Sequence, residues 1–293
     1  MTSLKPPTYL WCIVKTLDYQ KIIRGYRRWF NDPSERMTWF EPRRKLQAFV
    51  DDPKPHDFPA ATTNLQGPAA WHARRGCVLI AEGNTTEGWS EVARSFDYRL
   101  WLLRVDVERV RIMSGRGSHV ADATRDPFYL LNTAAAFRRW RDAAWIGDTV
   151  LRTLKTMGWY CGPIGRYSKK LYAMSGSLEF ARDQLGPYSD VFLNWQDTGV
   201  LADAIWKICD YHVEQLKAHG EFDRSPYDIF PSEILALYRV REKLGLETPW
   251  VKHPLLDTPF TQVPENITYE PDPLVVQAMD LVTKLLPEAV AKR

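Results

Sequence analysis

Residues 84–115 read NTTEGWSEVARSFDYRLWLLRVDVERVRIMSG, and this stretch decides the fold class. Its apolar residues recur at steps of three and four positions, as they do on one face of an α-helix. The stripe consists of Trp89, Val92, Phe96, Leu100, Leu103, Val107 and Val110. Asn84 and Glu87 have the spacing of a capping box, and Gly115 stands where a helix would end. The stretch therefore predicts one long helix whose apolar face lies against a core.

A second helical pattern begins at Asp126-Pro127, where a side-chain cap is followed by a residue that already has a helical φ. The pattern continues to Leu154 and predicts either one helix or two helices joined near Gly147. The intervening residues 114–126 are rich in Gly, Ser and Asp and are numerous enough to reverse the chain. We expect the two helical stretches to form an antiparallel hairpin.

The same periodicity predicts helices through most of the remaining chain. The expected helices cover 17–30, 36–50, 68–81, 168–185, 197–219, 226–245 and 272–285. Long alternating β-branched runs and the dipeptides of tight hairpins are absent from the sequence. We therefore predict an all-α fold, a multi-helix bundle of antiparallel helix pairs.

The domain organisation depends on a proline-rich stretch at residues 51–67. The simplest prediction is a single helical domain that covers residues 1–293. A surface loop of 17 residues within one domain explains the stretch. The alternative is an N-terminal helical arm, residues 1–60, that packs on a main bundle at residues 68–293.

Composition argues against several classes of partner. The chain has 39 basic and 36 acidic residues, a net charge of +3, which gives no strong attraction to phosphate backbones or anionic lipid. The apolar run from Tyr9 to Val14 is too short for a signal peptide or a membrane span. We expect a cytoplasmic protein with no membrane partner and no direct nucleic-acid partner.

The cysteines and histidines match no motif for metal binding or catalysis. Cys12, Cys77, Cys161 and Cys209 are widely spaced and form no CxxC pair, so they indicate reduced thiols in the core. The string HExxH does not occur, and no cysteine motif completes the half-motif His212-Val213-Glu214.

The sequence also argues against several other catalytic motifs. His56-Asp57 stands among three prolines, which exclude the regular helix of HD-type phosphohydrolases. Neither a glycine-rich phosphate loop nor a GxSxG elbow occurs in the sequence. We expect no catalytic residue, no metal ligand and no cofactor, and thus a protein that is not an enzyme.

Basic residues cluster at Arg24 to Arg28, Arg43 to Lys45, Arg74-Arg75 and Arg138 to Arg141, each with Trp or Tyr nearby. This mixture is found on nucleic-acid-binding surfaces. Acidic residues are interleaved, however, and the helical spacing favours solvated faces of amphipathic helices.

Residues 220–233, GEFDRSPYDIFPSE, differ from their neighbours because they combine acidic and aromatic side chains. An acidic loop with aromatic anchors suits the docking of a basic protein. We therefore predict partner-binding roles for Glu221, Asp223, Tyr227 and Asp228. The alternative is a connection between helices whose acids favour the dipole of the next helix.

Three strings in the C-terminal half carry a resemblance: DYHVEQ (210–215), PYDIFPSEILALYRVREKLGL (226–246) and HPLL (253–256). Their order resembles that in helical immunity proteins of bacterial polymorphic toxin systems, including those associated with type VI secretion. The resemblance covers roughly residues 85–260. It implies a cytoplasmic protein that binds one cognate toxin and blocks its active site or assembly.

Two other functions stay open. One is a helical enzyme whose metal site is assembled from dispersed His, Asp and Glu residues. The other is a helical scaffold associated with nucleic acid, which would bind DNA or RNA in a salt-dependent manner. The sequence makes no prediction of the oligomeric state.

Overall fold

A computed structural model describes residues 18–53, 65–113, 126–157, 162–173, 185–218 and 220–285. All regular structure in these residues is helical, and none of them lies in a strand, which confirms the all-α class. Among them, no helix combines the length and the apolar character that a membrane span requires.

The helices are joined by connections of different lengths, of which the longest described one runs from residue 244 to residue 272. Their bounds are α1 (Tyr19–Asn31), α2 (Pro33–Asp51), α4 (Gln66–Ala81), α5 (Thr85–Met113), α6 (Asp126–Ala136), α7 (Trp140–Met157), α8 (Pro163–Tyr172), α10 (Ser189–Leu193), α11 (Thr198–Lys217), α12 (Ser232–Lys243) and α13 (Pro273–Leu285). Short 3₁₀ turns occur at η3 (Gly186–Tyr188) and η4 (Pro259–Thr261).

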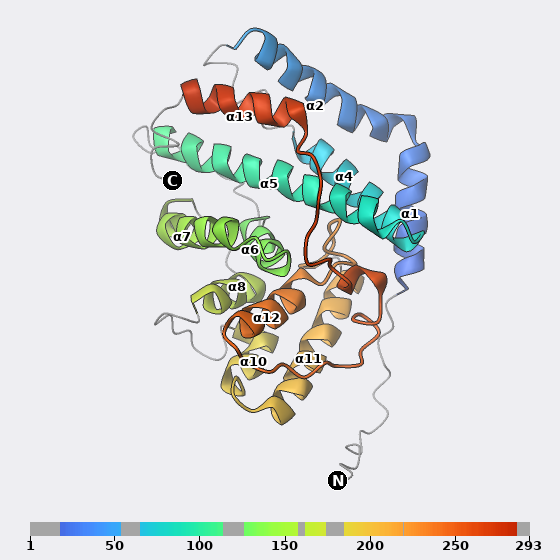
Figure 1. The fold of residues 1–293 in the computed structure, drawn as a ribbon, viewed down its shortest axis with the longest axis vertical. Coiled ribbons are helices and arrows are strands. Elements are labelled where there is room, and N and C mark those ends of the chain that lie inside the picture. The colour runs from blue at the N-terminus through green and yellow to red at the C-terminus, as the bar shows by residue number, and fades with distance from the viewer. Residues whose placement is uncertain are drawn as a thin grey trace.

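The helices stack in layers along the long axis of the molecule (Figure 1). In that view α2 and α13 lie at the top, α4 and α5 below them, and α6 and α7 in the middle. The lowest part contains α8, α10, α11 and α12, while α1 runs along one side. The segment between α12 and α13 crosses back over these layers, so the last helix lies beside the second.

Three groups of buried apolar side chains fill the spaces between the layers. The upper group joins α2, α4, α5 and α13, and the middle group joins α1, α4, α5, α6 and α7. The lower group joins α8, α11, α12 and residues 251–256. Because α2 shares the upper group through Leu46 and Phe49, residues 18–53 pack on the rest of the chain. Whether they form a separate arm stays a prediction.

The helices α4 and α5 approach each other closely at Gly76 and Gly88. A Cβ atom placed on Gly76 would lie 2.6 Å from the backbone oxygen of Gly88. Nearer the N-terminal end of α4, the Ser95 hydroxyl donates a hydrogen bond of 2.7 Å to the carbonyl of Ala69. Contacts between 76 and 88 and between 69 and 95 show that the two helices run antiparallel.

The long helix at residues 85–113 confirms the prediction from residues 84–115, while its pairing with the helix after Asp126 stays a prediction. We expected it to pair with the helix that follows Asp126, and its most extensive contact is with α4. The chain reverses within residues 82–84, where Gly83 has a φ of 89°. The connection at 114–125 lies outside the described residues. That the other helices form antiparallel pairs stays a prediction.

The helical stretch after Asp126 consists of two helices, but the break is not near Gly147. It lies at residues 137–139, where Arg138 has the left-handed φ of 56°. Gly147 lies inside α7, and a Cβ atom there would approach the ring of Tyr172 to 2.5 Å. This glycine therefore permits the close approach of α8 to α7 and does not end a helix.

The remaining helices agree with the predictions except around α8, at α12, which begins at Ser232 rather than Pro226, and at the short helix α10, which was not predicted. This helix begins at Pro163 rather than Ser168, and residues 174–184 of the predicted 168–185 helix lie outside the described residues. Asp197 caps α11 by accepting hydrogen bonds from the backbone N–H groups of Gly199 and Val200. Cys77 and Cys209 are buried and unbridged, as the sequence predicted, while Cys12 and Cys161 lie outside the described residues.

The contact between α4 and α5 gives a direct test of the fold. Gly76→Ala should lower the free energy of unfolding by about 2 kcal/mol, because the new methyl group meets the backbone of α5. Gly25→Ala in α1 is the matched control, since a Cβ atom there meets no atom within 4 Å. It should raise stability by about 0.5–1 kcal/mol through helix propensity. Urea unfolding measures both, and equal effects would contradict the proposed contact.

Candidate protein-binding site

The predicted partner-binding loop packs between other elements of the protein. Tyr227 is only 2% exposed, and its ring stacks on Tyr129 of α6 at 4.6 Å between centroids. The guanidinium of Arg99 lies 5.4 Å from the centre of the Tyr227 ring and donates a hydrogen bond of 2.7 Å to the carbonyl of Ser225. The loop is thus anchored to α5 and α6.

The other three predicted residues differ in exposure. The Glu221 side chain is buried and accepts a hydrogen bond of 2.9 Å from the Tyr211 hydroxyl. The carboxylate of Asp228 is partly buried and accepts a hydrogen bond from Tyr26 of α1. Asp223 is exposed to solvent. In this conformation, only Asp223 of the four presents an exposed side chain, and the partner-binding role of the set stays a prediction.

The environment of Asp228 changes its protonation. Burial raises the pKa of this carboxyl from 3.8 to about 6, even though the hydrogen bond from Tyr26 favours the ionised form. Burial, with a smaller contribution from the Asp228 charge, also raises the pKa of Tyr26 well above its usual value. The pair therefore holds α1 against the loop at the cost of a partly buried charge near neutral pH.

Three histidines each lie against one carboxylate. His212 Nδ1 is 2.7 Å from Glu233 Oε1, His72 Nδ1 is 2.6 Å from Glu91 Oε2, and His253 Nε2 is 3.2 Å from Asp210 Oδ1. Their partners are 19 to 43 positions away, and no motif joins them.

A histidine paired with a carboxylate is also the arrangement of a general base. His212 and Glu233, however, are 0% and 1% exposed, and neither lines either of the cavities described below. The His212 ring stacks on Phe222 at 4.0 Å, and burial lowers the pKa of His253. The three pairs connect separate parts of the fold. They join α4 to α5, α11 to α12, and residue 253 to α11.

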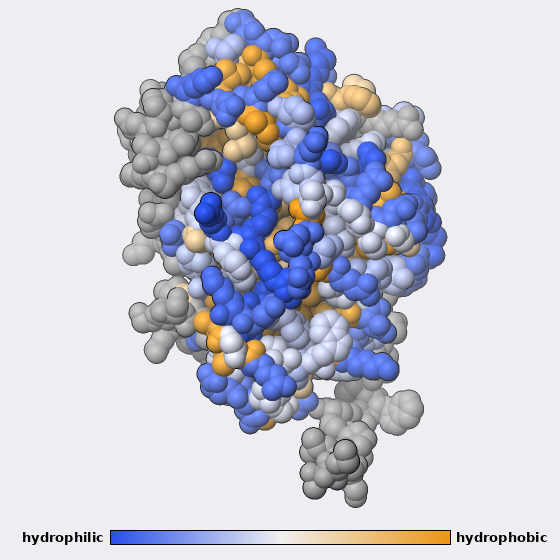
Figure 2. Space-filling model, in the orientation of Figure 1, coloured by the Kyte–Doolittle hydropathy of each residue, from blue (hydrophilic) through white to orange (hydrophobic). Residues whose placement is uncertain are grey.

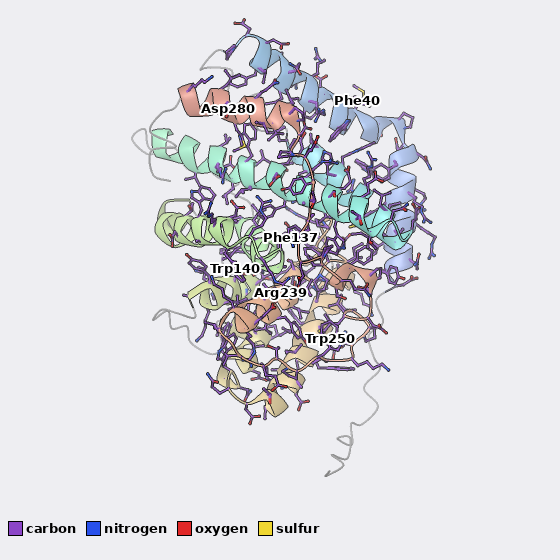
Figure 3. The ribbon with its side chains drawn as sticks, viewed as in Figure 1. Phe40, Phe137, Trp140, Arg239, Trp250 and Asp280 are labelled. Atoms are coloured by element: carbon purple, nitrogen blue, oxygen red, sulfur yellow. The ribbon has the colours of Figure 1, made fainter. Side chains whose placement is uncertain are left out.

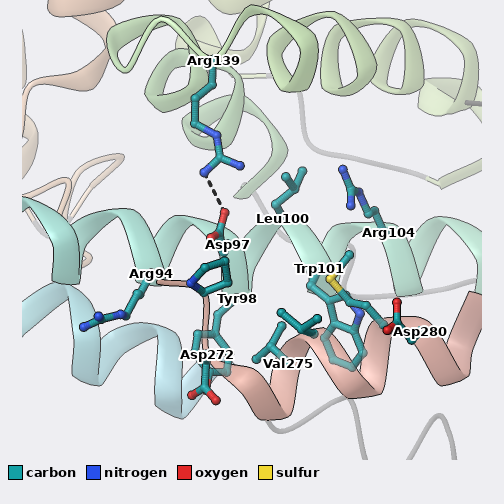
Figure 4. Close-up of a pocket in the computed structure, with 13 residues that line it drawn as sticks. Arg94, Asp97, Tyr98, Leu100, Trp101, Arg104, Arg139, Asp272, Val275 and Asp280 are labelled. Carbon is teal, nitrogen blue, oxygen red and sulfur yellow. Dashed lines mark hydrogen bonds and ion pairs between the residues drawn. The ribbon is translucent and has the colours of Figure 1, made fainter. Parts of the chain in front are cut away.

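One cavity of about 260 Å³ opens between α5, α13 and the α6–α7 turn (Figure 4). Several of its charged side chains are paired: Arg139 lies 2.7 Å from Asp97, and Asp272 binds both Arg43 and Tyr98. Figure 2 shows apolar atoms over α13, next to a mostly hydrophilic band across the centre. The apolar part of the lining includes Leu100, Trp101, Val275, Val276 and Met279. The cavity suits a small group that is partly apolar and partly polar.

A second cavity of about 470 Å³ lies between α6, α7, α8 and α12. Its lining is largely apolar, with Trp140 at one side and the ammonium of Lys243 lying 4.3 Å from the centre of the Trp140 ring. Asn132 is buried in the wall, and its Nδ2 has no hydrogen-bond partner among the described residues. No pattern in the sequence predicted either cavity, because each wall combines helices distant along the chain.

Within the described ranges, no three His, Cys, Asp or Glu side chains are grouped so as to hold a metal ion. His56-Asp57 lies outside those ranges. No protein-family model, curated protein or solved structure matches this chain. The geometry of the described residues is therefore the evidence on which a function is proposed.

The burial of Tyr227 predicts how variants of the loop behave. Tyr227→Ala should lower the free energy of unfolding by about 3 kcal/mol, because it leaves a cavity between Tyr129 and Arg99. Asp223→Lys should change it by less than about 0.5 kcal/mol, because the side chain is exposed. Urea unfolding measures both values. Similar stability of the two variants would show that Tyr227 is not packed in the core.

The raised pKa of Asp228 predicts a pH-dependent change in stability. The folded protein binds the proton of this carboxyl more tightly than the unfolded chain does. Ionisation of Asp228 therefore lowers the free energy of unfolding as the pH rises from 3.8 to about 6, and the full loss is present above that range. Asp228→Asn keeps an acceptor for Tyr26 and should raise the free energy of unfolding by about 2 kcal/mol at pH 8. The gain should fall by more than half at pH 4.5. Urea titrations at both pH values measure it, and a gain independent of pH would contradict the assignment.

Proposed function

We propose that this protein is an immunity protein that binds a cognate toxin and neutralises it through protein–protein contact. The observation that carries the proposal is that the three strings that resemble immunity proteins come together in space. Residues 210–215 lie on α11, residues 226–246 form α12 and the turn before it, and residues 253–256 form a turn against α11. They are separated in sequence but share one buried group.

Specific side chains of these strings bind one another. His212 of the first string binds Glu233 of the second, and His253 of the third binds Asp210 of the first. Leu255 and Leu256 pack in the same apolar group as Val213 and Leu237. A resemblance limited to scattered surface positions would have no such common packing. The contacts support the interpretation that the three strings act together to maintain one structural unit.

The architecture also suits an inhibitor. Buried hydrogen-bonded pairs between helices are costly to break, because a buried polar group left without its partner is destabilising, so they resist changes in helix position. His72–Glu91 and His212–Glu233 place such pairs in the upper and lower parts of the molecule. A surface held in one shape loses less conformational entropy on binding. This preorganisation favours tight binding to one partner.

Co-expression with the polypeptide encoded next to this gene tests the proposal. That polypeptide should be toxic when expressed alone and harmless when this protein is present. The two should then co-purify as a complex with one copy of each, measured by size-exclusion chromatography with light scattering. We expect no requirement for an added cofactor.

Each alternative function predicts a different result. A stoichiometric divalent metal in the purified protein, together with no neutralisation, would favour the helical enzyme. Binding to generic DNA or RNA that weakens steeply with salt would favour the nucleic-acid scaffold. Either result, without protection from the neighbouring polypeptide, would contradict the proposed immunity function.

A further inference from the structure

The cavity between α6, α7, α8 and α12 has the size of a binding site for a small molecule. Its volume of about 470 Å³ lies within the range of ligand pockets in proteins. Figure 3 shows Trp140, one of its lining residues, in the space between α7 and α12. The lining also includes the exposed residues Ala144, Lys243 and Leu244, so the cavity is open to solvent. The proposed immunity function does not use this cavity.

Most of the cavity wall is apolar and suits an apolar part of a ligand. Beside the ring of Trp140, five aliphatic side chains from four helices form this part of the wall. They are Leu131, Ala135, Ala143, Leu171 and Val240. The ring of Tyr172 lines the cavity as well, and its hydroxyl donates a hydrogen bond of 2.9 Å to Asp148. An apolar group that enters this space leaves water, which favours binding.

Asn132 of α6 is a polar group that this apolar wall leaves without a partner. Its side chain is 1% exposed, and among the described residues its Nδ2 finds no hydrogen-bond acceptor. A buried donor without an acceptor lowers stability, because the donor has lost its hydrogen bonds to water. Asn132 lines the cavity, so an oxygen atom of a ligand in the cavity can supply the acceptor. The position thus favours a ligand with a hydrogen-bond-accepting oxygen.

The charge at the cavity favours an anion. Lys243 of α12 lines the cavity, and no aspartate or glutamate does so among the described residues. The Lys243 ammonium lies 4.3 Å from the centre of the Trp140 ring and, within the part of the chain that the structure describes, forms no ion pair. The neighbouring Glu242 is paired with Arg138 and Arg239 instead. A ligand with a negative charge therefore gains an attraction that a cation does not.

We infer that this cavity binds a small carboxylic acid with a compact apolar body. The body contacts the Trp140 ring and the aliphatic wall. The carboxylate lies near the Lys243 ammonium, and one of its oxygens accepts a hydrogen bond from Asn132 Nδ2. This inference goes beyond the proposed immunity function and does not rest on it.

Calorimetric titration with acids and amines of similar shape tests the class of ligand. The acids are 4-phenylbutyrate and 2-naphthoate, and the matched cations are 4-phenylbutylamine and 2-naphthylmethylamine. At least one acid should bind one site per chain with a dissociation constant below about 5 mM. Its amine should bind at least about threefold more weakly, as expected for one ion pair near the surface. Failure of both acids to bind, or an amine that binds as tightly as its acid, would overturn the inference.

Variants of the two polar groups test the location. Asn132→Leu keeps a similar volume and should raise the dissociation constant of the acid at least about fivefold. The same change should not lower the free energy of unfolding, because leucine removes an unpartnered buried donor. Lys243→Gln should raise the constant about threefold, and this effect should fall at high salt. Lys252→Gln is the control, since Lys252 is exposed and lines neither cavity, and it should leave the constant unchanged.

Urea unfolding verifies that the three variants fold. Acid binding that neither Asn132→Leu nor Lys243→Gln weakens would place the acid elsewhere on the protein and would overturn the inference. The titrations use this chain alone, without a partner protein. Their failure therefore leaves the proposed immunity function untouched, and failure of the co-expression experiment leaves the acid site untouched.

Discussion

Gly76 and Gly88 bring the backbones of α4 and α5 into contact, and the positions of the other layers depend on that contact. The helix α5 is buried on more than one side. It supplies Trp89 and Phe96 to the middle apolar group and Tyr98, Trp101 and Val105 to the upper one. If α4 stood further away, the space between these groups would open. Larger side chains at the two glycines would have this effect, because packed interiors have little spare volume.

The same helix shows how far the sequence predicts the fold. The apolar stripe of residues 84–115 predicted the helix and one buried face, since period and caps are local properties. The second buried face was not predicted, because Tyr98 and Trp101 lie off that stripe and are interspersed with arginines and aspartates. Likewise, Gly147 was read as a helix boundary, but Tyr172 decides its role. Close contacts between distant residues leave no local signal in a single sequence.

The candidate site was harder to predict than the fold. Acidic and aromatic residues at 220–233 are compatible with two interpretations from sequence alone, a docking loop and an internal connection. In the structure Tyr227 stacks on Tyr129, and Asp228 binds Tyr26, which is 202 positions earlier. The basic clusters were interpreted as solvated faces, and Arg27, Arg44 and Arg75 do form exposed ion pairs.

The contacts of the first two helices have a consequence for synthesis. The partner of Tyr26 on α1 is Asp228, and the partner of Arg43 on α2 is Asp272, which is 229 positions later. A ribosome adds about 5–20 residues per second, so roughly 10–40 s separate the emergence of each helix from that of its partner. During this time the nascent chain carries α1 and α2 without their native ion pair and hydrogen bonds. Docking of α1 and α2 through these contacts therefore waits until Asp228 and Asp272 have been synthesised.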